Sequence, residues 1–180
     1  MGKAFAELDE TNVKWIKKQR MFFVATAPAA VDGLLNLSPK GLDAFAVIDP
    51  TTVAYLDIVG CGVETIAHVK QNGRLIIMFC DFEGPPRILR LWGKGEVIER
   101  SDPRFAPMRA RFAQVPGERS IIVLRVTRVQ DSCGYGVPRY AFEQDRTTLD
   151  RLGPEKGPQG VDEYIANKNH KSTDGLPGLA

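Results

Sequence analysis

The sequence predicts a mainly β protein: a small antiparallel β-barrel of about seven strands with short peripheral helices. Apolar and β-branched runs of strand length recur between residues 21 and 129, most are joined by short turns, and only short helical patterns separate them. Short turns connect antiparallel neighbours, because a parallel crossover needs about a dozen residues or more. Seven antiparallel strands protect their edges best by closing into a barrel.

The first part of the chain supplies one helix and four strands. Asp9 to Asn12 offers N-cap residues for a short amphipathic helix that reaches about Gln19. Apolar runs then predict strands over residues 21–26, 34–38, 44–48 and 52–58. Proline, glycine and aspartate between these runs indicate reversals, so the four strands are expected to be antiparallel neighbours.

The stretch from Tyr55 to Glu96 organises the rest of the chain. Its strand ends at Gly60-Cys61-Gly62, a short helix follows, and Asn72-Gly73 closes that helix with residues that tolerate left-handed dihedrals. Strands are predicted over 75–79 and 87–97. Gly93-Lys94-Gly95 lies inside the second of these strands and predicts a bulge or a barrel bend.

The last third predicts one more helix, one long strand and a polar extension. Ser101-Asp102-Pro103 is typical of a helix start, and residues 119–129 read as a half-buried strand. From Glu143 onward the chain turns polar and allows one or two short helices at most. Composition slightly favours disorder there. We nevertheless expect a split β-barrel domain over residues 1–140 and an extension over 141–180 that packs on it, because its turn pairs and small apolar set permit an ordered segment.

Composition excludes several classes of function. A net charge of +2 is too small for nucleic acid or an anionic membrane to be the main partner. The N-terminus lacks a signal-peptide core and no apolar run approaches ~18 residues, so a cytoplasmic protein is expected. Three separated cysteines and two histidines indicate neither a disulfide framework nor a metal site. No nucleophile motif is present, so no catalytic residue is identified.

Side chains suited to a phosphate occur at several strand and helix ends: Asn36, Ser38, Lys40, Gly62, Thr65, Arg87 and Arg90. A helix that starts on Gly-x-Gly leaves its first N–H groups free for an anion, and the arginines could neutralise its charge. The alternative is a surface loop with ordinary surface arginines. His68, inside the same helix, is interpreted as a polar-face or cap-region residue rather than a base.

The ordered motifs NLSPKG, VAYLDIVGCGVETIAHVKQNGRLIIMF, PPRILRLWGKGEV and DSCGYGVP resemble the flavin-binding split-barrel family related to pyridoxamine 5′-phosphate oxidase. The resemblance covers roughly residues 10 to 140 and implies a split-barrel homodimer with one FMN at each end of the subunit interface. In the vitamin-producing oxidases, a basic strand residue and an arginine-lysine pair opening a helix hold the FMN phosphate. The matching positions here are Lys40 and Glu64-Thr65, so one expected cation is replaced by a carboxylate.

The resemblance therefore implies an FMN-binding homodimeric oxidoreductase with an unidentified small-molecule substrate. Thr65 can still donate a hydrogen bond, and Arg87 or Arg90 could replace the lost charge, provided that Glu64 turns to another partner. No match to the family's substrate-phosphate residues is found, so pyridoxamine phosphate is not the expected substrate. Two alternatives stay open: a non-enzymatic flavin carrier or sensor, and a split-barrel protein that binds haem or a deazaflavin.

Overall fold

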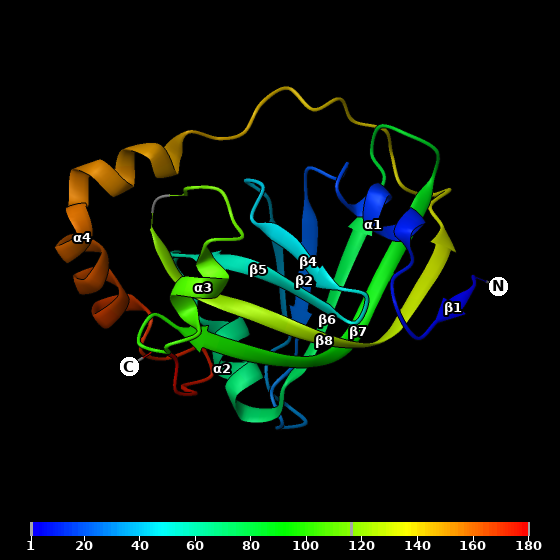
Figure 1. Cartoon of the computed structure of the whole chain (residues 1–180). Coiled ribbons are helices and arrows are strands. Elements are labelled where there is room, and N and C mark those ends of the chain that lie inside the picture. The colour runs from blue at the N-terminus through cyan, green and yellow to red at the C-terminus, as the bar shows by residue number, and fades with distance from the viewer. Residues whose placement is uncertain (1, 116, 180) are drawn as a thin grey trace.

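The computed structural model describes residues 2–115 and 117–179, with the side chains of 150–156 and 158 left out, and contains eight strands and four helices in that part of the chain (Figure 1). Their order is β1 (Ala4–Phe5), α1 (Glu10–Ile16), β2 (Phe22–Thr26), β3 (Asn36–Lys40), β4 (Phe45–Asp49), β5 (Thr52–Ile58), α2 (Glu64–Asn72), β6 (Arg74–Cys80), β7 (Arg87–Glu99), α3 (Phe105–Arg109), β8 (Glu118–Cys133) and α4 (Thr148–Lys168).

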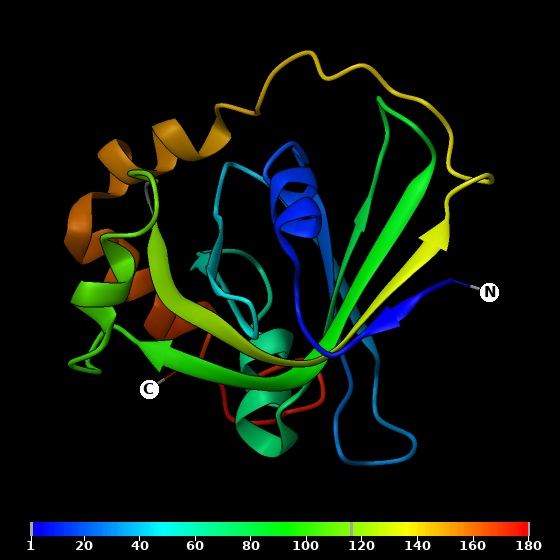
Figure 2. The ribbon, with the colours of Figure 1, turned by 45° about the vertical axis from the view of Figure 1, so that its right-hand side comes forward.

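The strands form one antiparallel sheet in the order β3-β2-β6-β7-β8-β5-β4, with the short β1 added to β8. Strands β3 and β4 end this order, and they are consecutive in the chain, so residues 41–44 join the two outer strands. Figures 1 and 2 show β7 and β8 curving along the sheet while the other strands wrap around one interior. The predicted mainly β, antiparallel split barrel with short helices is confirmed.

The curvature of β7 has a local cause at Gly93. The β7–β8 register shifts between Trp92 and Gly93, which is the bulge that the glycines predict. A Cβ on Gly93 would lie 1.8 Å from the carbonyl oxygen of Arg125, so only glycine allows this close approach. At the end of α2, Gly73 takes a φ of 70° and stops the helix, as Asn72-Gly73 predicts.

The barrel interior is filled by apolar side chains from alternate strand positions, with an aromatic cluster at one end. The rings of Phe22 and Phe45 lie 5.1 Å apart, and Phe45 meets Phe79 edge-to-face at 5.0 Å. Tyr55 completes the cluster beside Phe22. All four rings lie in or against the main core, which fixes the inner faces of β2, β4, β5 and β6.

The helices differ most from the sequence expectation. The helix predicted from Ser101 begins only at Phe105, because Ser101 to Arg104 form turns. Helix α4 is longer than the short helices expected, but Gly157, with a φ of 62° and a ψ of 178°, breaks it into two pieces. Among the described residues, no helix combines the length and apolarity needed to cross a membrane.

Candidate functional site

A cavity of about 350 Å³ lies where β3, the β5–α2 connection and the start of β8 meet. Five of the seven residues that the sequence singles out line it together: Asn36, Ser38, Lys40, Gly62 and Thr65. The cavity is within the size range of small-molecule sites, near its lower end. Its further lining residues include Cys61, Glu64, Arg119 and Leu149.

Pairing with β2 places three of these residues on one face. Asn36, Ser38 and Lys40 stand directly opposite Thr26, Val24 and Phe22, whose side chains are buried in the barrel. Residues directly opposite in an antiparallel pair share a face, so β3 turns its alternate polar side chains inward. Leu37 and Pro39, between them, are exposed on the outer face.

Hydrogen bonds orient the polar groups in the cavity. The Asn36 amide nitrogen donates to the Thr65 hydroxyl at 2.9 Å, and its carbonyl oxygen accepts from Ser38 Oγ at 3.1 Å. This links β3 to the first turn of α2. A site whose donors already hold one another loses little entropy when a ligand binds.

The network continues to His68, which the sequence analysis places wrongly on the polar face. His68 is only 1% exposed. Its Nδ1 lies 3.0 Å from Thr26 Oγ1, and the Asn36 amide donates to that same hydroxyl at 3.2 Å. Burial lowers the pKa of His68, although nearby Asp174 and Glu64 oppose the shift. His68 therefore supports Asn36 from behind the cavity as a neutral ring.

A buried carboxylate organises the cations of the site. Asp57 is 0% exposed and accepts from Arg119 Nε at 2.6 Å and from Lys40 Nζ at 3.3 Å. Ser120, its partner in the β5–β8 register, adds a longer hydrogen bond at 3.3 Å. Burial alone would raise the pKa of Asp57, but the charges of Arg119 and Lys40 bring that pKa below its ordinary value.

Arg119 is the site residue that the sequence analysis misses. Its Nη1 donates to the Gly62 carbonyl at 2.9 Å, so it ties β8 to the loop before α2 while lining the cavity. The available signal was Asp57, a lone acid inside an apolar strand. Such an acid requires a buried cation, but only the β5–β8 register shows which one.

Glu64 forms hydrogen bonds with Thr173 of the C-terminal region. The sequence analysis requires such a partner if Glu64 is to lie near a bound phosphate. Its Oε1 accepts from the backbone N–H of Thr173 at 3.2 Å and from the Thr173 hydroxyl at 2.9 Å. Burial alone would raise the pKa of Glu64, but hydrogen bonds from its own N–H and from Thr173 hold that pKa below its ordinary value. A Cβ on Gly62 would meet Glu64 Oε2 at 2.1 Å, so glycine leaves room for this carboxylate.

Arg87 and Arg90 are not brought to the cavity within this chain. They lie on β7, which β2 and β6 separate from β3. Arg87 binds Asp131 through Nε at 3.0 Å and stacks over the Trp15 ring at 4.6 Å. Arg90 donates to Ser132 Oγ at 2.9 Å.

The last eleven described residues, 169–179, form a C-terminal hairpin closed by a bridge between Lys171 and Pro177. This hairpin reaches the loop before α2 through Asn169, whose amide donates to the Gly60 carbonyl at 3.0 Å. Lys70 of α2 donates to the Gly178 carbonyl at 2.6 Å. Leu179 is buried in the main core, so the hairpin is anchored at both ends.

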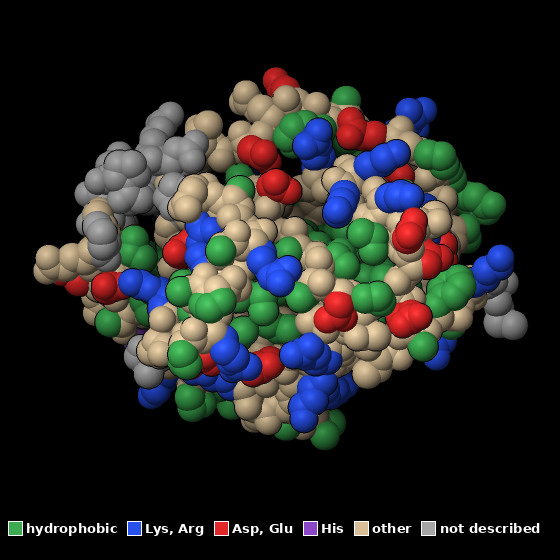
Figure 3. All heavy atoms as spheres, in the orientation of Figure 1, with side chains coloured by type: hydrophobic (Ala, Val, Ile, Leu, Met, Phe, Trp, Pro, Cys, Tyr) green, Lys and Arg blue, Asp and Glu red, His purple; other side chains and the backbone are tan. Residues whose placement is uncertain are grey.

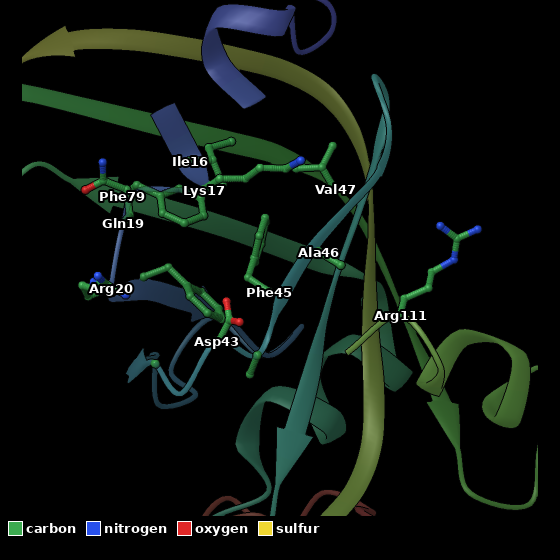
Figure 4. Close-up of a pocket in the computed structure, with 13 residues that line it drawn as sticks. Ile16, Lys17, Gln19, Arg20, Asp43, Phe45, Ala46, Val47, Phe79 and Arg111 are labelled. Carbon is green, nitrogen blue, oxygen red and sulfur yellow. The ribbon is translucent and has the colours of Figure 1, made fainter. Parts of the chain in front are cut away.

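Two further cavities meet the first one at Gly41. One, of about 400 Å³, opens over Phe22, Phe45 and Phe79 between the end of α1 and β4. Figure 4 shows the rings of Phe45 and Phe79 there, with Arg111 apart from them. The other, of about 900 Å³, lies under residues 140–146 and shares Lys40 and Gly41 with the first.

The connection at this junction is strained. Leu42 and Asp43 both have positive φ, 64° and 53°, which costs a non-glycine residue about 1 kcal/mol or more. Leu42 lines the first cavity and Asp43 the second. Such strain is typical of loops that hold a functional geometry.

The described surface carries side chains of both charges. Figure 3 shows basic and acidic side chains interspersed on one face, around a hollow with hydrophobic side chains at its floor. No group of three or more histidine, cysteine, aspartate or glutamate side chains among the described residues has the geometry to hold a metal ion.

Comparisons with known proteins give a family match over most of the chain. A family model described as pyridoxamine 5′-phosphate oxidase matches residues 8–133. The pyridoxamine 5′-phosphate oxidase family protein ustO of Aspergillus flavus is 40% identical over 194 residues, which cover 97% of this chain and 77% of that protein. The match thus extends beyond the barrel to the C-terminal region.

Solved structures share the fold at lower identity. A Lactobacillus delbrueckii protein, solved as a candidate pyridoxamine 5′-phosphate oxidase, is 23% identical with a TM-score of 0.55, covering 69% of this chain and 94% of that one. HupZ of Group A Streptococcus is 21% identical with a TM-score of 0.52, covering 68% of this chain and 91% of that one. At these identities the likeness concerns the fold alone.

Proposed function

The chain belongs to the pyridoxamine 5′-phosphate oxidase family, and from this premise we propose that it is an FMN-binding, homodimeric oxidoreductase that acts on a small organic substrate. The observation that carries the proposal is the cavity of about 350 Å³, which is lined by two cationic side chains and two hydroxyl side chains: Lys40, Arg119, Ser38 and Thr65. Flavin supplies the redox chemistry when it is bound. The chain's own residues bind, orient and shield it.

The residues present fit the phosphate end of FMN. Lys40 and Arg119 supply positive charge, while Ser38 and Thr65 supply hydroxyls from β3 and α2. Asp57 forms ion pairs with both Lys40 and Arg119, so the two cations would already be in position when a phosphate binds. Arg119 takes over the part that the sequence analysis gives to Arg87 or Arg90, because those two have other partners.

Room beside the cofactor cavity favours an oxidoreductase over a flavin carrier. The cavities of about 400 Å³ and 900 Å³ adjoin it at Gly41. A carrier needs no space for a second molecule, whereas an enzyme does. The family name does not identify the substrate, since the helix that opens with Glu64-Thr65 departs from the vitamin-producing oxidases.

A homodimer fits the outer surface of β3. This strand ends the sheet order and therefore presents an unpaired edge. Leu35 and Leu37 at this edge are 81% and 67% exposed, and Val31 and Leu34 in the preceding loop are exposed as well. A second copy of the chain would cover both the edge and this apolar run, close to the cavity that β3 lines.

The proposal is tested by the ligand that accompanies the purified chain and by its affinity. We expect a flavin spectrum, and mass spectrometry of the released ligand identifies FMN rather than haem or a deazaflavin. Lys40→Ala should weaken FMN binding by about 1.5–3 kcal/mol, because it removes a charge-assisted hydrogen bond.

The matched control is Lys14→Ala, which removes a lysine from an exposed pair with Glu10 on α1. This control should leave the affinity unchanged at low and moderate salt. A purified chain that binds no flavin even when FMN is added would contradict the proposal, and equal affinities for all three proteins would remove Lys40 from the site.

A further inference from the structure

The charges around the cofactor cavity balance one another. Lys40 and Arg119 contribute two positive charges, while Asp57 and Glu64 contribute two negative ones. Asp57 is fully buried and forms ion pairs with both cations, so its negative charge is compensated by them. Glu64 differs because it pairs with none of the described cations and lines the cavity itself.

The Glu64 carboxylate is held by the C-terminal hairpin on one side and accommodated by Gly62 on the other. Thr173 of the C-terminal hairpin donates its backbone N–H and its hydroxyl to Oε1. Oε2 lies over Gly62, where a Cβ would be only 2.1 Å away. Glycine at position 62 therefore leaves room for Oε2, while Thr173 of the hairpin holds Oε1 at the first turn of α2.

We propose that Glu64 is a specificity-determining residue, which weakens the preference of the cavity for a terminal phosphate over an uncharged or less charged group. The inference rests on the proposed flavin site and deepens it. Thr173 holds one oxygen of that carboxylate through its backbone N–H and its hydroxyl.

The physical reason is repulsion between like charges in a partly enclosed space. A phosphate monoester carries about −1.5 to −2 charges at pH 7, so it gains from Lys40 and Arg119 but is opposed by Glu64. An uncharged ribityl end feels neither effect. The ratio of FMN to riboflavin affinity therefore measures the charge of the cavity directly, independently of how well the flavin ring is bound.

The test compares wild type, Glu64→Gln and Thr173→Val, each as the full chain freed of copurified ligand. Glutamine keeps the shape and the acceptor for Thr173 but loses the charge. We expect Glu64→Gln to raise FMN affinity about tenfold and to change riboflavin affinity less than about twofold. Thr173→Val loses the hydroxyl bond but keeps the Glu64 charge, so its FMN-to-riboflavin ratio should stay near that of wild type.

Inorganic phosphate gives a second readout that does not depend on flavin. Thermal unfolding followed over a phosphate titration should show half-maximal stabilisation of Glu64→Gln at about a tenfold lower phosphate concentration than wild type. If wild type binds FMN but the variant shows unchanged ratios and an unchanged phosphate titration, the role of Glu64 is overturned while the proposed function stands. If no protein binds FMN but the phosphate difference is present, the proposed function fails and the role of Glu64 stands.

Discussion

Asp57 is a carboxylate with no contact to solvent, held between Arg119 and Lys40. An isolated charge in that position would be strongly unfavourable, so its two partners decide whether the site folds at all. Breaking a buried pair by removing one partner typically costs about 3–5 kcal/mol, whereas neutralising both partners together often costs little. The pair is thus a structural requirement as well as part of the proposed cofactor site.

We expect Arg119→Gln to lower the free energy of unfolding by about 3–5 kcal/mol, because Asp57 then keeps Lys40 as its only cation, at the longer distance of 3.3 Å, together with the Ser120 hydroxyl. The double variant Asp57→Asn with Arg119→Gln should recover most of that loss. Urea unfolding of the three proteins at neutral pH measures the difference. Equal losses in the single and double variants would show that packing of the arginine, rather than charge, is what matters.

The same pair predicts how stability depends on acid. The folded-state pKa of Asp57 is below its unfolded value of about 3.9, so the unfolded chain binds more protons than the native one. Its contribution is therefore complete above about pH 4 and is lost as the pH falls further, through the folded-state pKa. The double variant should lack this part of the acid-induced loss.

At the level of single residues, the sequence indicates which polar side chains line the cavity better than it indicates which residues pair with them. Asn36, Ser38 and Lys40 alternate along one strand, and alternation alone places them on one face. Arg119 could not be assigned in the same way, because its role depends on which strand lies beside β5. Arg87 and Arg90 follow a turn that is near in sequence but lies across the sheet.

The C-terminal hairpin of residues 169–179 is the segment whose order the amino-acid composition predicts least well. It is polar, yet Asn169 and Ser172 are buried, and Asp174 accepts from the Leu34 N–H at 2.8 Å. Its contacts extend to the loop before α2, to α2 itself and to the loop before β3. These segments lie at or next to the cavity proposed for the cofactor.

We expect a chain ending at Lys168 to keep the barrel folded but to release FMN about tenfold faster, since most changes in affinity appear in the dissociation rate. The reason is that Gly60, Glu64 and Leu34 each lose a hydrogen bond that holds the cavity wall. Fluorescence recovery of released flavin gives the rate. Lys171→Ala, an exposed change within the hairpin, is the control, and equal release rates from all three proteins would separate the hairpin from cofactor retention.

Strands were predicted more accurately than helices for a physical reason. The bulge at Gly93 and the stop at Gly73 are local, since each follows from backbone freedom at one residue. Helix α3 is shorter than its start signal indicates, because residues 101–104 turn instead. The break of α4 at Gly157 is local as well, because its φ of 62° and ψ of 178° suit a glycine. The path of the hairpin, by contrast, depends on contacts with distant segments, which no local pattern encodes.

Viewed as a whole, the described sheet ends in two strands that each have a neighbour on one side only, β3 and β4, and the edge at β3 carries exposed apolar side chains. β3 pairs with β2 on one side only, and its outward Leu37 continues an exposed apolar run that begins at Val31. A long exposed apolar edge is unfavourable for an isolated chain. Because the inner face of this strand lines the cavity proposed for the cofactor, a partner on its outer face would also support Asn36, Ser38 and Lys40.

We therefore expect sedimentation to give twice the 19.9 kDa mass of one chain, and Leu37→Lys to shift the protein toward the monomer. A lysine on an edge strand opposes strand pairing by charge and solvation, without changing the buried face. The same variant should retain FMN less well, because β3 loses the support of the second subunit.

Tyr135→Lys is the matched control, since Tyr135 is 83% exposed and lies outside the apolar run. A stable 19.9 kDa species with flavin fully bound would refute the dimer, and a monomeric Leu37→Lys that holds flavin as tightly as wild type would show that each subunit completes its own site.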